Sequence, residues 1–356
     1  MAVQLVVAIV AFVLILGLLI FVHEAGHFIA ARMAGIKVVE FGMGFPPRLL
    51  SFKRGETIYS LNAIPLGGFC KLLGEEDPSK AGSFASKSAG TRFGVLVAGP
   101  LMNAVLPIVL LSIAFMVPRQ VVLGDVVIDQ VAANSPAAEA GIQVGDTVLS
   151  VNGKPVQSAG DVIYDVHLSM GESTALVLKG ADGVQKTVSL VPRWNPPAGE
   201  GAVGVSMNMV NTQEVSQSDP FWVAVPKSGT TIWDTFVLMR NEVAGWFIKK
   251  TAPQVTGPVG IFQLTGEASQ AGPSYLLQFA AFLSMNLAIV NLFPLPALDG
   301  GRIAFIFLEV VRRGKRVSPR TEGLVHLVGF MMLIGLMLVV SYYDILRTIR
   351  GESLVP

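Results

Sequence analysis

Four apolar segments without Lys, Arg, Asp or Glu set the strongest constraint on the fold of this chain; they are 3–22, 93–117, 275–293 and 324–343. A helix needs about 20 apolar residues to cross the roughly 30 Å hydrocarbon core of a bilayer. Of the 356 residues, 52% are hydrophobic and only 14% are charged, which a soluble protein rarely shows. We therefore expect an α-helical polytopic membrane protein with four transmembrane helices.

Two stretches between these segments have strand-like patterns. In the first, the runs 49–52 and 57–63 alternate around the turn sequence KRGE, which predicts a β-hairpin. In the second, 120–193, short β-branched runs surround one helical stretch, which predicts a small α+β domain inserted between the second and third membrane helices. The Pro/Gly-rich stretch 195–219 is expected to be a linker.

Basic residues set the expected orientation, because Lys and Arg near the ends of membrane helices favour the cytoplasm. The segment 311–320 has five Lys or Arg and no acid, and further basic residues flank the hairpin region. Both segments are expected to be cytoplasmic, which places the inserted domain and both termini outside the cytoplasm. The net charge of +1 gives no indication of a nucleic-acid partner.

The sequence HEAGH, residues 23–27, directly follows the first apolar segment. Residues four apart lie on one face of a helix, so the imidazoles of His23 and His27 can reach one metal ion while Glu24 serves as a base. A chance match to this pattern and a pair of buried histidines bonded to backbone are the alternatives. The membrane position weakens both, because ionisable groups at membrane depth are costly and are usually functional.

A catalytic zinc site normally has three protein ligands and an open position, and Asp299 is the candidate for the third ligand. It lies in NLFPLPALDGGR, residues 291–302, where two prolines prevent a regular helix. The alternative is a solvated aspartate in a helix-ending turn. Asp299 meets HEAGH only if the first and third membrane helices run in the same direction. The charged segment 221–248 is therefore expected to be an amphipathic helix on the outer membrane surface rather than a further crossing.

Three motifs together resemble one family of membrane proteins; they are HEAGH (23–27), AGPLMN (98–103) and NLFPLPALDGG (291–301). They are similar to the site-2 protease family of intramembrane zinc metalloproteases, peptidase family M50, and to its bacterial RseP-like branch in particular. The resemblance implies one Zn²⁺ ion per chain, held by His23, His27 and Asp299, with Glu24 as the catalytic base.

A transmembrane substrate hides its scissile carbonyls in helical hydrogen bonds, so it must be unwound locally. An exposed strand edge in the hairpin region, at 41–45 or 61–68, is a candidate for pairing with an extended peptide; a structural hairpin that covers the site is the alternative. The resemblance favours the first, because relatives carry a membrane-associated β element with Gly-x-Gly. The substrate-binding residues expected on this basis are Gly42, Gly44, Asn103 and Asn291, the last of which has helix bridging as its alternative role.

The segment 131–156 resembles a PDZ domain of the bacterial protease type, and PDZ domains bind chain ends or extended segments by strand addition. The domain either grips a cut substrate terminus or excludes substrates with bulky outer domains. The second role is favoured, because 121–125 contains no convincing carboxylate-binding loop. Many RseP-like relatives have two PDZ domains, whereas this chain has room for one.

The resemblance implies cleavage of transmembrane segments of single-span proteins in the bacterial cytoplasmic (inner) membrane, near its cytoplasmic face. Expected substrates are anti-sigma factors, membrane-tethered regulators and remnant signal peptides, usually cut first by another protease. The expected partners are these substrates and the lipid bilayer, with no nucleic acid. An inactive PDZ adaptor and a zinc transporter remain open, although an adaptor has no need of Glu24 and a transport path requires more ionisable groups within the membrane.

The expected organisation is a first membrane helix over 1–32, a cytoplasmic membrane-associated β region over 33–90, a second membrane helix over 91–117, a PDZ domain over 120–194, a linker with a surface helix over 195–274, a third membrane helix with the LDG motif over 275–301, a basic cytoplasmic loop over 302–322, and a fourth membrane helix with a tail over 323–356. Two other residues are expected to be structural: Cys70 as a small buried hydrophobe, and His326 as a packed or hydrogen-bonded side chain.

Overall fold

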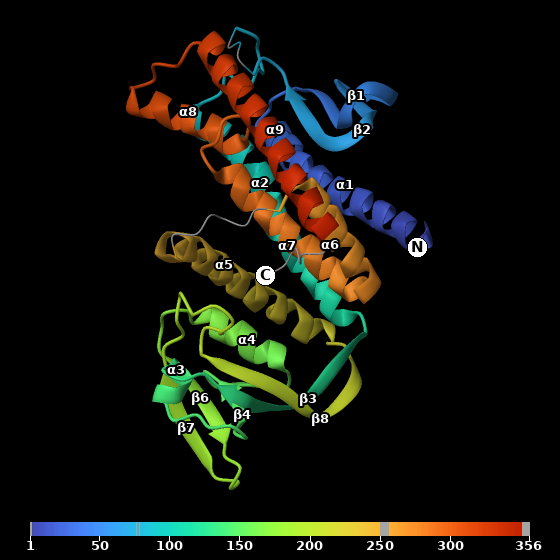
Figure 1. Cartoon of the computed structure of the whole chain (residues 1–356). Helices are drawn as coiled ribbons and strands as arrows, with labels where there is room; N and C mark the ends of the chain where they lie inside the picture. The colour runs from blue at the N-terminus through green and yellow to red at the C-terminus, as the bar shows by residue number, and fades with distance from the viewer. Residues whose placement is uncertain (1, 76, 78, 250–255, 351–356) are drawn as a thin grey trace. The chain divides into compact units, whose positions relative to one another are not determined.

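The computed structural model describes residues 2–75, 77, 79–249 and 256–350. The chain divides into two compact units, which are Met1–Phe115 with Val255–Pro356, and Met116–Gln254. The first unit contains the candidate membrane helices and the hairpin. The second unit corresponds to the inserted domain (Figure 1).

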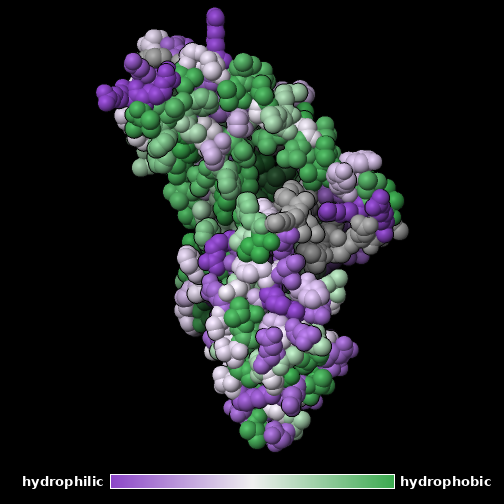
Figure 2. All heavy atoms as spheres, turned by 60° about the vertical axis from the view of Figure 1, so that its left-hand side comes forward, coloured by the Kyte–Doolittle hydropathy of each residue, from purple (hydrophilic) through white to green (hydrophobic). Residues whose placement is uncertain are grey.

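Four helices among the described residues are long and apolar enough to cross a membrane. They are α1 (Ala2–Met33), α2 (Ala89–Met116), α7 (Pro273–Leu292) and α9 (Pro319–Arg350). The four predicted segments lie in these helices except for residues 117 and 293, so the prediction of a polytopic membrane protein is confirmed. Figure 2 shows hydrophobic side chains over much of the visible surface of this helical unit. Such a surface is suited to a hydrocarbon environment.

The helical unit has two further helices, α6 (Pro258–Ala271) and α8 (Asp299–Val311). Helix α6 packs against α1, α7 and α9. Helix α8 occupies the first half of the segment predicted as the loop 302–322, and that prediction is wrong here. The physical reason is burial, because Ile303 and Ile306, one turn apart, pack into a core that also contains Ile36 and Val95.

The predicted hairpin is present but longer, with β1 (Val38–Arg54) antiparallel to β2 (Thr57–Leu72). Both strands fold back, so the first part of β1 pairs on both sides. Gly42, for example, lies opposite Ser60 on one side and Phe69 on the other. The carbonyl of Gly44 accepts a hydrogen bond from Asn62 Nδ2 at 3.0 Å.

The prediction that Gly42 and Gly44 offer a free strand edge is therefore wrong, because their own chain occupies both sides of this segment. The start of 61–68 is likewise enclosed, since Leu61 lies opposite both Met43 and Leu50. The segment 68–72 pairs with β1 on one side, and the described strands provide no partner for its other side.

The second unit is built on a six-stranded sheet in the order β7-β6-β4-β3-β8, with β5 paired to β4. The strands are β3 (Arg119–Val131), β4 (Thr147–Val151), β5 (Lys154–Pro155), β6 (Thr174–Lys179), β7 (Gln185–Leu190) and β8 (Val205–Gln217). Helices α3 (Pro136–Glu139) and α4 (Ala159–Leu168) belong to the same unit. Strand β8 corrects the prediction of a linker over 195–219. It pairs with β3 and packs Val205, Met207 and Met209 against the core.

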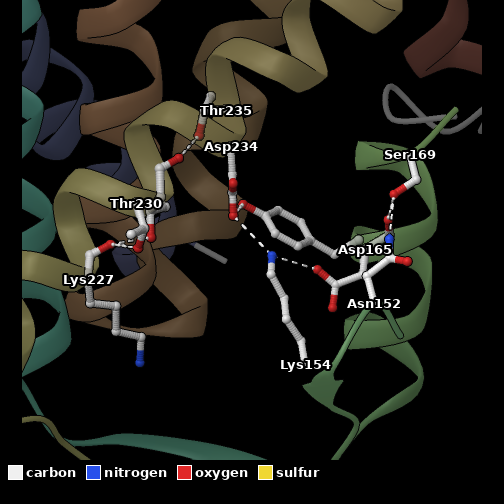
Figure 3. A network of polar contacts seen from close by, with 10 residues as sticks. Asn152, Lys154, Asp165, Ser169, Lys227, Thr230, Asp234 and Thr235 are labelled. Atoms are coloured by element: carbon white, nitrogen blue, oxygen red, sulfur yellow. Dashed lines mark hydrogen bonds and ion pairs between the residues drawn. The ribbon is translucent and has the colours of Figure 1, made fainter. Parts of the chain in front are cut away.

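Helix α5 (Phe221–Lys249) packs against α4 in the second unit. Figure 3 shows Lys154 between two carboxylates, with Nζ 3.0 Å from Asp165 Oδ1 and 3.5 Å from Asp234 Oδ2. Asn241 Nδ2 donates to the carbonyls of His167 and Leu168 at 2.9 and 3.2 Å. These carbonyls lie at the end of α4, where helical carbonyls lack partners within the helix. One face of the predicted surface helix 221–248 therefore contacts its own domain, and contact of the other face with lipid stays a prediction.

Candidate metal centre

Three side chains predicted as metal ligands come together in the helical unit. His23 Nε2 lies 3.2 Å from His27 Nε2, and Asp299 Oδ2 lies 3.0 and 3.2 Å from these two nitrogens. Both histidines are buried. Two imidazole nitrogens and one carboxylate oxygen form a donor set that fits zinc and leaves a coordination position open. Asp299 therefore lies beside both histidines, as the proposed ligand set requires.

Glycines allow α1 and α2 to approach closely at this centre. A Cβ atom on Gly26 would overlap the carbonyl of Ala98, and a Cβ atom on Gly99 would overlap His27 Nε2. The first glycine belongs to HEAGH and the second to AGPLMN. The two motifs therefore pair because each supplies a glycine at the crossing of the helices.

Gly99→Ala is expected to displace the His27 imidazole and to lower zinc affinity by at least about tenfold, the lower bound for disturbing the support of a metal ligand. Zinc content after equilibration with a competing chelator measures this effect. Gly94→Ala on the same helix is the matched control, because nothing lies within 4 Å of a Cβ atom there. Equal zinc affinity in both variants would contradict the close-approach account.

His27 is oriented by the backbone of α2. Its Nδ1 lies 2.8 Å from the carbonyl oxygen of Val95, so Nδ1 carries the proton and donates it. Nε2 of His27 is thus left free for a metal.

Asp299 is positioned by the proline-interrupted turn between α7 and α8. The turn folds so tightly that a Cβ atom on Gly300 would overlap the carbonyl of Phe293. Ala297 adopts a left-handed conformation with φ of 73°, which is strained for a residue with a side chain. Its N–H donates to His326 Nδ1 at 2.8 Å. The prediction that His326 is hydrogen-bonded is confirmed, and the bond holds the turn that presents Asp299.

The far end of α8 is anchored by ion pairs. Arg92 Nη2 lies 2.7 Å from Glu309 Oε2, and Arg316 Nε lies 3.2 Å from Glu309 Oε1. Burial raises the pKa of the Glu309 carboxyl, but hydrogen bonds from Arg92 and Arg316 outweigh it and hold the pKa below its usual range. The carboxylate is therefore ionised at neutral pH, and this anchor weakens only when the pH falls through that lowered pKa.

Glu24 lies beside the centre and next to the hairpin. A Cβ atom on Gly68 would lie 3.1 Å from Glu24 Cγ, and the Glu24 carboxylate lies near the backbone of Cys70. The segment 68–72 therefore runs beside Glu24. Burial raises the pKa of the Cys70 thiol, so the free thiol stays protonated at neutral pH.

The two predicted asparagines lie in different surroundings. Asn291 is in the last turn of α7 and is 9% exposed. Asn103 is fully buried, with Nδ2 3.4 Å from His23 Nδ1. Sequence reasoning did not identify the roles of Gly99 and of the Cys70 backbone. The AGPLMN motif contained a signal for Gly99, whereas no sequence signal marks a backbone contact.

Comparisons with known proteins agree with this geometry. The family model for peptidase family M50 matches residues 11–336. A protein of Clostridium acetobutylicum that is named as a zinc metalloprotease is 37% identical, with 98% of each chain covered. The regulator of sigma-W protease RasP of Bacillus subtilis is 30% identical, covering 95% of this chain and 98% of its own. The zinc metalloprotease RasP of Geobacillus kaustophilus is 29% identical, with 95% and 97% covered. The chain therefore belongs to peptidase family M50 and is a multi-pass bacterial membrane zinc metalloendopeptidase.

Proposed function

We propose that this metalloendopeptidase hydrolyses transmembrane segments of single-span proteins, with His23, His27 and Asp299 as zinc ligands and Glu24 as the general base. The convergence of the three donor atoms within 4.8 Å of one another carries the proposal. Their location supports cleavage at membrane depth, because two of them lie on the membrane helix α1. Zinc, when bound, polarises the scissile carbonyl and makes a water acidic enough to attack near neutral pH.

The side chains around the metal centre have the other catalytic roles. Glu24 takes the proton from the attacking water and later delivers it to the leaving amine. Asn291, in the last turn of α7, donates to the substrate backbone or to the carbonyl oxygen as charge develops there. His27 and Asp299 hold their positions through the Val95 carbonyl and the proline turn, so the centre does not have to reorganise during the reaction.

The substrate is bound as an extended strand along 68–72. This assignment replaces the predicted edge at 41–45, which is paired on both sides. The backbone contact between Cys70 and Glu24 supports it, because a peptide added there lies beside the base. Strand addition supplies the backbone hydrogen bonds that the substrate helix loses when it unwinds.

The second unit is a PDZ domain that acts on the extracytoplasmic part of the substrate. The edge strand β8 pairs with β3 and also lies near α4. The glycine-rich stretch 199–204 directly precedes β8, whereas 121–125 is part of the internal strand β3. An edge strand preceded by such a turn favours binding of an extended chain end over steric exclusion. Both termini are extracytoplasmic in this arrangement, and the metal centre is near the cytoplasmic face.

The substrates are membrane-tethered regulators, anti-sigma factors and remnant signal peptides, after a first cut by another protease. The name of the Bacillus subtilis relative, a regulator of sigma-W protease, supports the anti-sigma class.

The test is cleavage of a tagged single-span substrate by the purified chain in detergent. We expect cleavage to stop when a chelator removes zinc and to return on addition of one equivalent of Zn²⁺, because the hydrolytic centre is the only role assigned to the metal. An adaptor would bind the substrate through the second unit without cutting it. A transporter would move zinc across proteoliposomes, and either result without cleavage would contradict the proposal.

A further inference from the structure

We propose that Asn103 positions a zinc ligand: its side-chain oxygen accepts a hydrogen bond from His23 Nδ1–H and so holds Nε2 of His23 towards the metal. The inference rests on the proposed ligand set of His23, His27 and Asp299. It assigns Asn103 to the support of the metal centre instead of to substrate contact.

The chemistry of the two histidines demands such an acceptor. Both rings present Nε2 to the centre, since these are the atoms that lie 3.0 and 3.2 Å from Asp299 Oδ2. A neutral imidazole that binds a metal through Nε2 carries its proton on Nδ1. For His27 the Val95 carbonyl accepts this proton. His23 is equally buried, at 8% exposed, and a buried N–H without an acceptor is costly.

The amide of Asn103 lies at the required place. Its Nδ2 is 3.4 Å from His23 Nδ1, and its Oδ1 is buried without a hydrogen-bond partner among the described residues. With the proton on His23 Nδ1, this N–H and the Asn103 amide N–H would face each other, while Asn103 Oδ1 accepts no hydrogen bond. A half-turn of the amide exchanges Oδ1 and Nδ2, an exchange that only the surrounding hydrogen bonds can decide. It places Oδ1 at the His23 N–H, so that an acceptor meets the donor there.

The backbone of Asn103 is fixed from the opposite side. Ser284 Oγ on α7 donates to the carbonyl oxygen of Asn103 at 2.8 Å, and neither residue has exposed surface. Helix α2 therefore holds Asn103 between α7 and the His23 ring. A substrate cannot reach a side chain enclosed in this way, which is why the predicted substrate contact is replaced.

Two variants of Asn103 test whether its side chain acts as a hydrogen-bond acceptor for His23 or only fills space between the helices. Asn103→Leu keeps a similar volume but removes the acceptor, and zinc is expected to bind about 10- to 100-fold more weakly, the usual loss when the partner of a ligand imidazole is removed. Asn103→Asp restores an acceptor and is expected to keep zinc affinity within about threefold of wild type. Zinc competition with a chelator, on full-length protein in detergent, measures these changes without substrate.

Two control variants distinguish a failure of the proposed ligand set from a failure of the role proposed for Asn103. Ser112→Ala removes a different buried polar side chain of α2, whose Oγ donates to the Ile108 carbonyl at 2.6 Å. This variant is expected to bind zinc as wild type does. His23→Ala is expected to lose zinc; if it does not, the ligand set itself fails, and this inference fails with it. If His23→Ala loses zinc but Asn103→Leu binds it normally, only the inference is overturned. Loss of zinc in both Asn103 variants also overturns it, because the acceptor then makes no difference.

Discussion

Glu24→Gln is expected to reduce cleavage by about 10²- to 10⁴-fold, the usual contribution of a general base, while zinc stays bound at one equivalent. The amide is nearly isosteric with the carboxylate but cannot take a proton from water. Zinc remains because the three proposed ligands are untouched. The turnover of a tagged substrate and the zinc content of the same sample give the two readouts.

The control for this variant is Glu139→Gln, which changes an exposed acid of α3 in the second unit. It is expected to cleave as wild type does. Full activity in Glu24→Gln would show that Glu24 is not the general base. Loss of zinc together with activity would instead make Glu24 a residue that the metal centre needs for its structure.

Asp299→Ala is expected to weaken zinc binding by more than about 100-fold, beyond the range seen when only an outer partner of a ligand is lost, and to abolish cleavage. The substitution leaves two imidazoles, one ligand fewer than a catalytic zinc site normally has. Zinc titration against a chelator measures the first effect and substrate turnover the second.

Asp129→Ala, a change at an exposed acid of β3, is the matched control and is expected to match wild type in both assays. A fully zinc-loaded and active Asp299→Ala protein would show that the third ligand lies elsewhere. The convergence of Asp299 on His23 and His27 would then have no catalytic meaning.

The membrane helices and the metal ligands were predictable from sequence, because each rests on a local pattern. Hydropathy alone identifies segments such as 93–117. The i, i+4 spacing places His23 and His27 on one helix face. Asp299 was the candidate for the third ligand because of the motif in which it lies, and its meeting with the histidines required the first and third membrane helices to run in the same direction.

The errors came from contacts between distant parts of the chain. The fold-back of β1 depends on pairing of Gly42 with both Ser60 and Phe69, which no local alternation reveals. The stretch 195–219 was predicted as a linker from its Pro and Gly content, whereas the partial burial of Val205, Met207 and Met209 depends on the sheet. The surroundings of Asn103 depend on how α2 is rotated against α1, and the close approach at Gly26 and Gly99 sets that rotation.

The position of the cut bond tests the central claim most directly. A single-span substrate with tags on both sides is reconstituted with wild-type protein in proteoliposomes, and mass spectrometry identifies both new termini, with Glu24→Gln as the blank. The account predicts one or a few cuts inside the apolar span, absent from the blank. Cuts confined to the flanking polar segments, made by fully zinc-loaded protein, would contradict intramembrane hydrolysis.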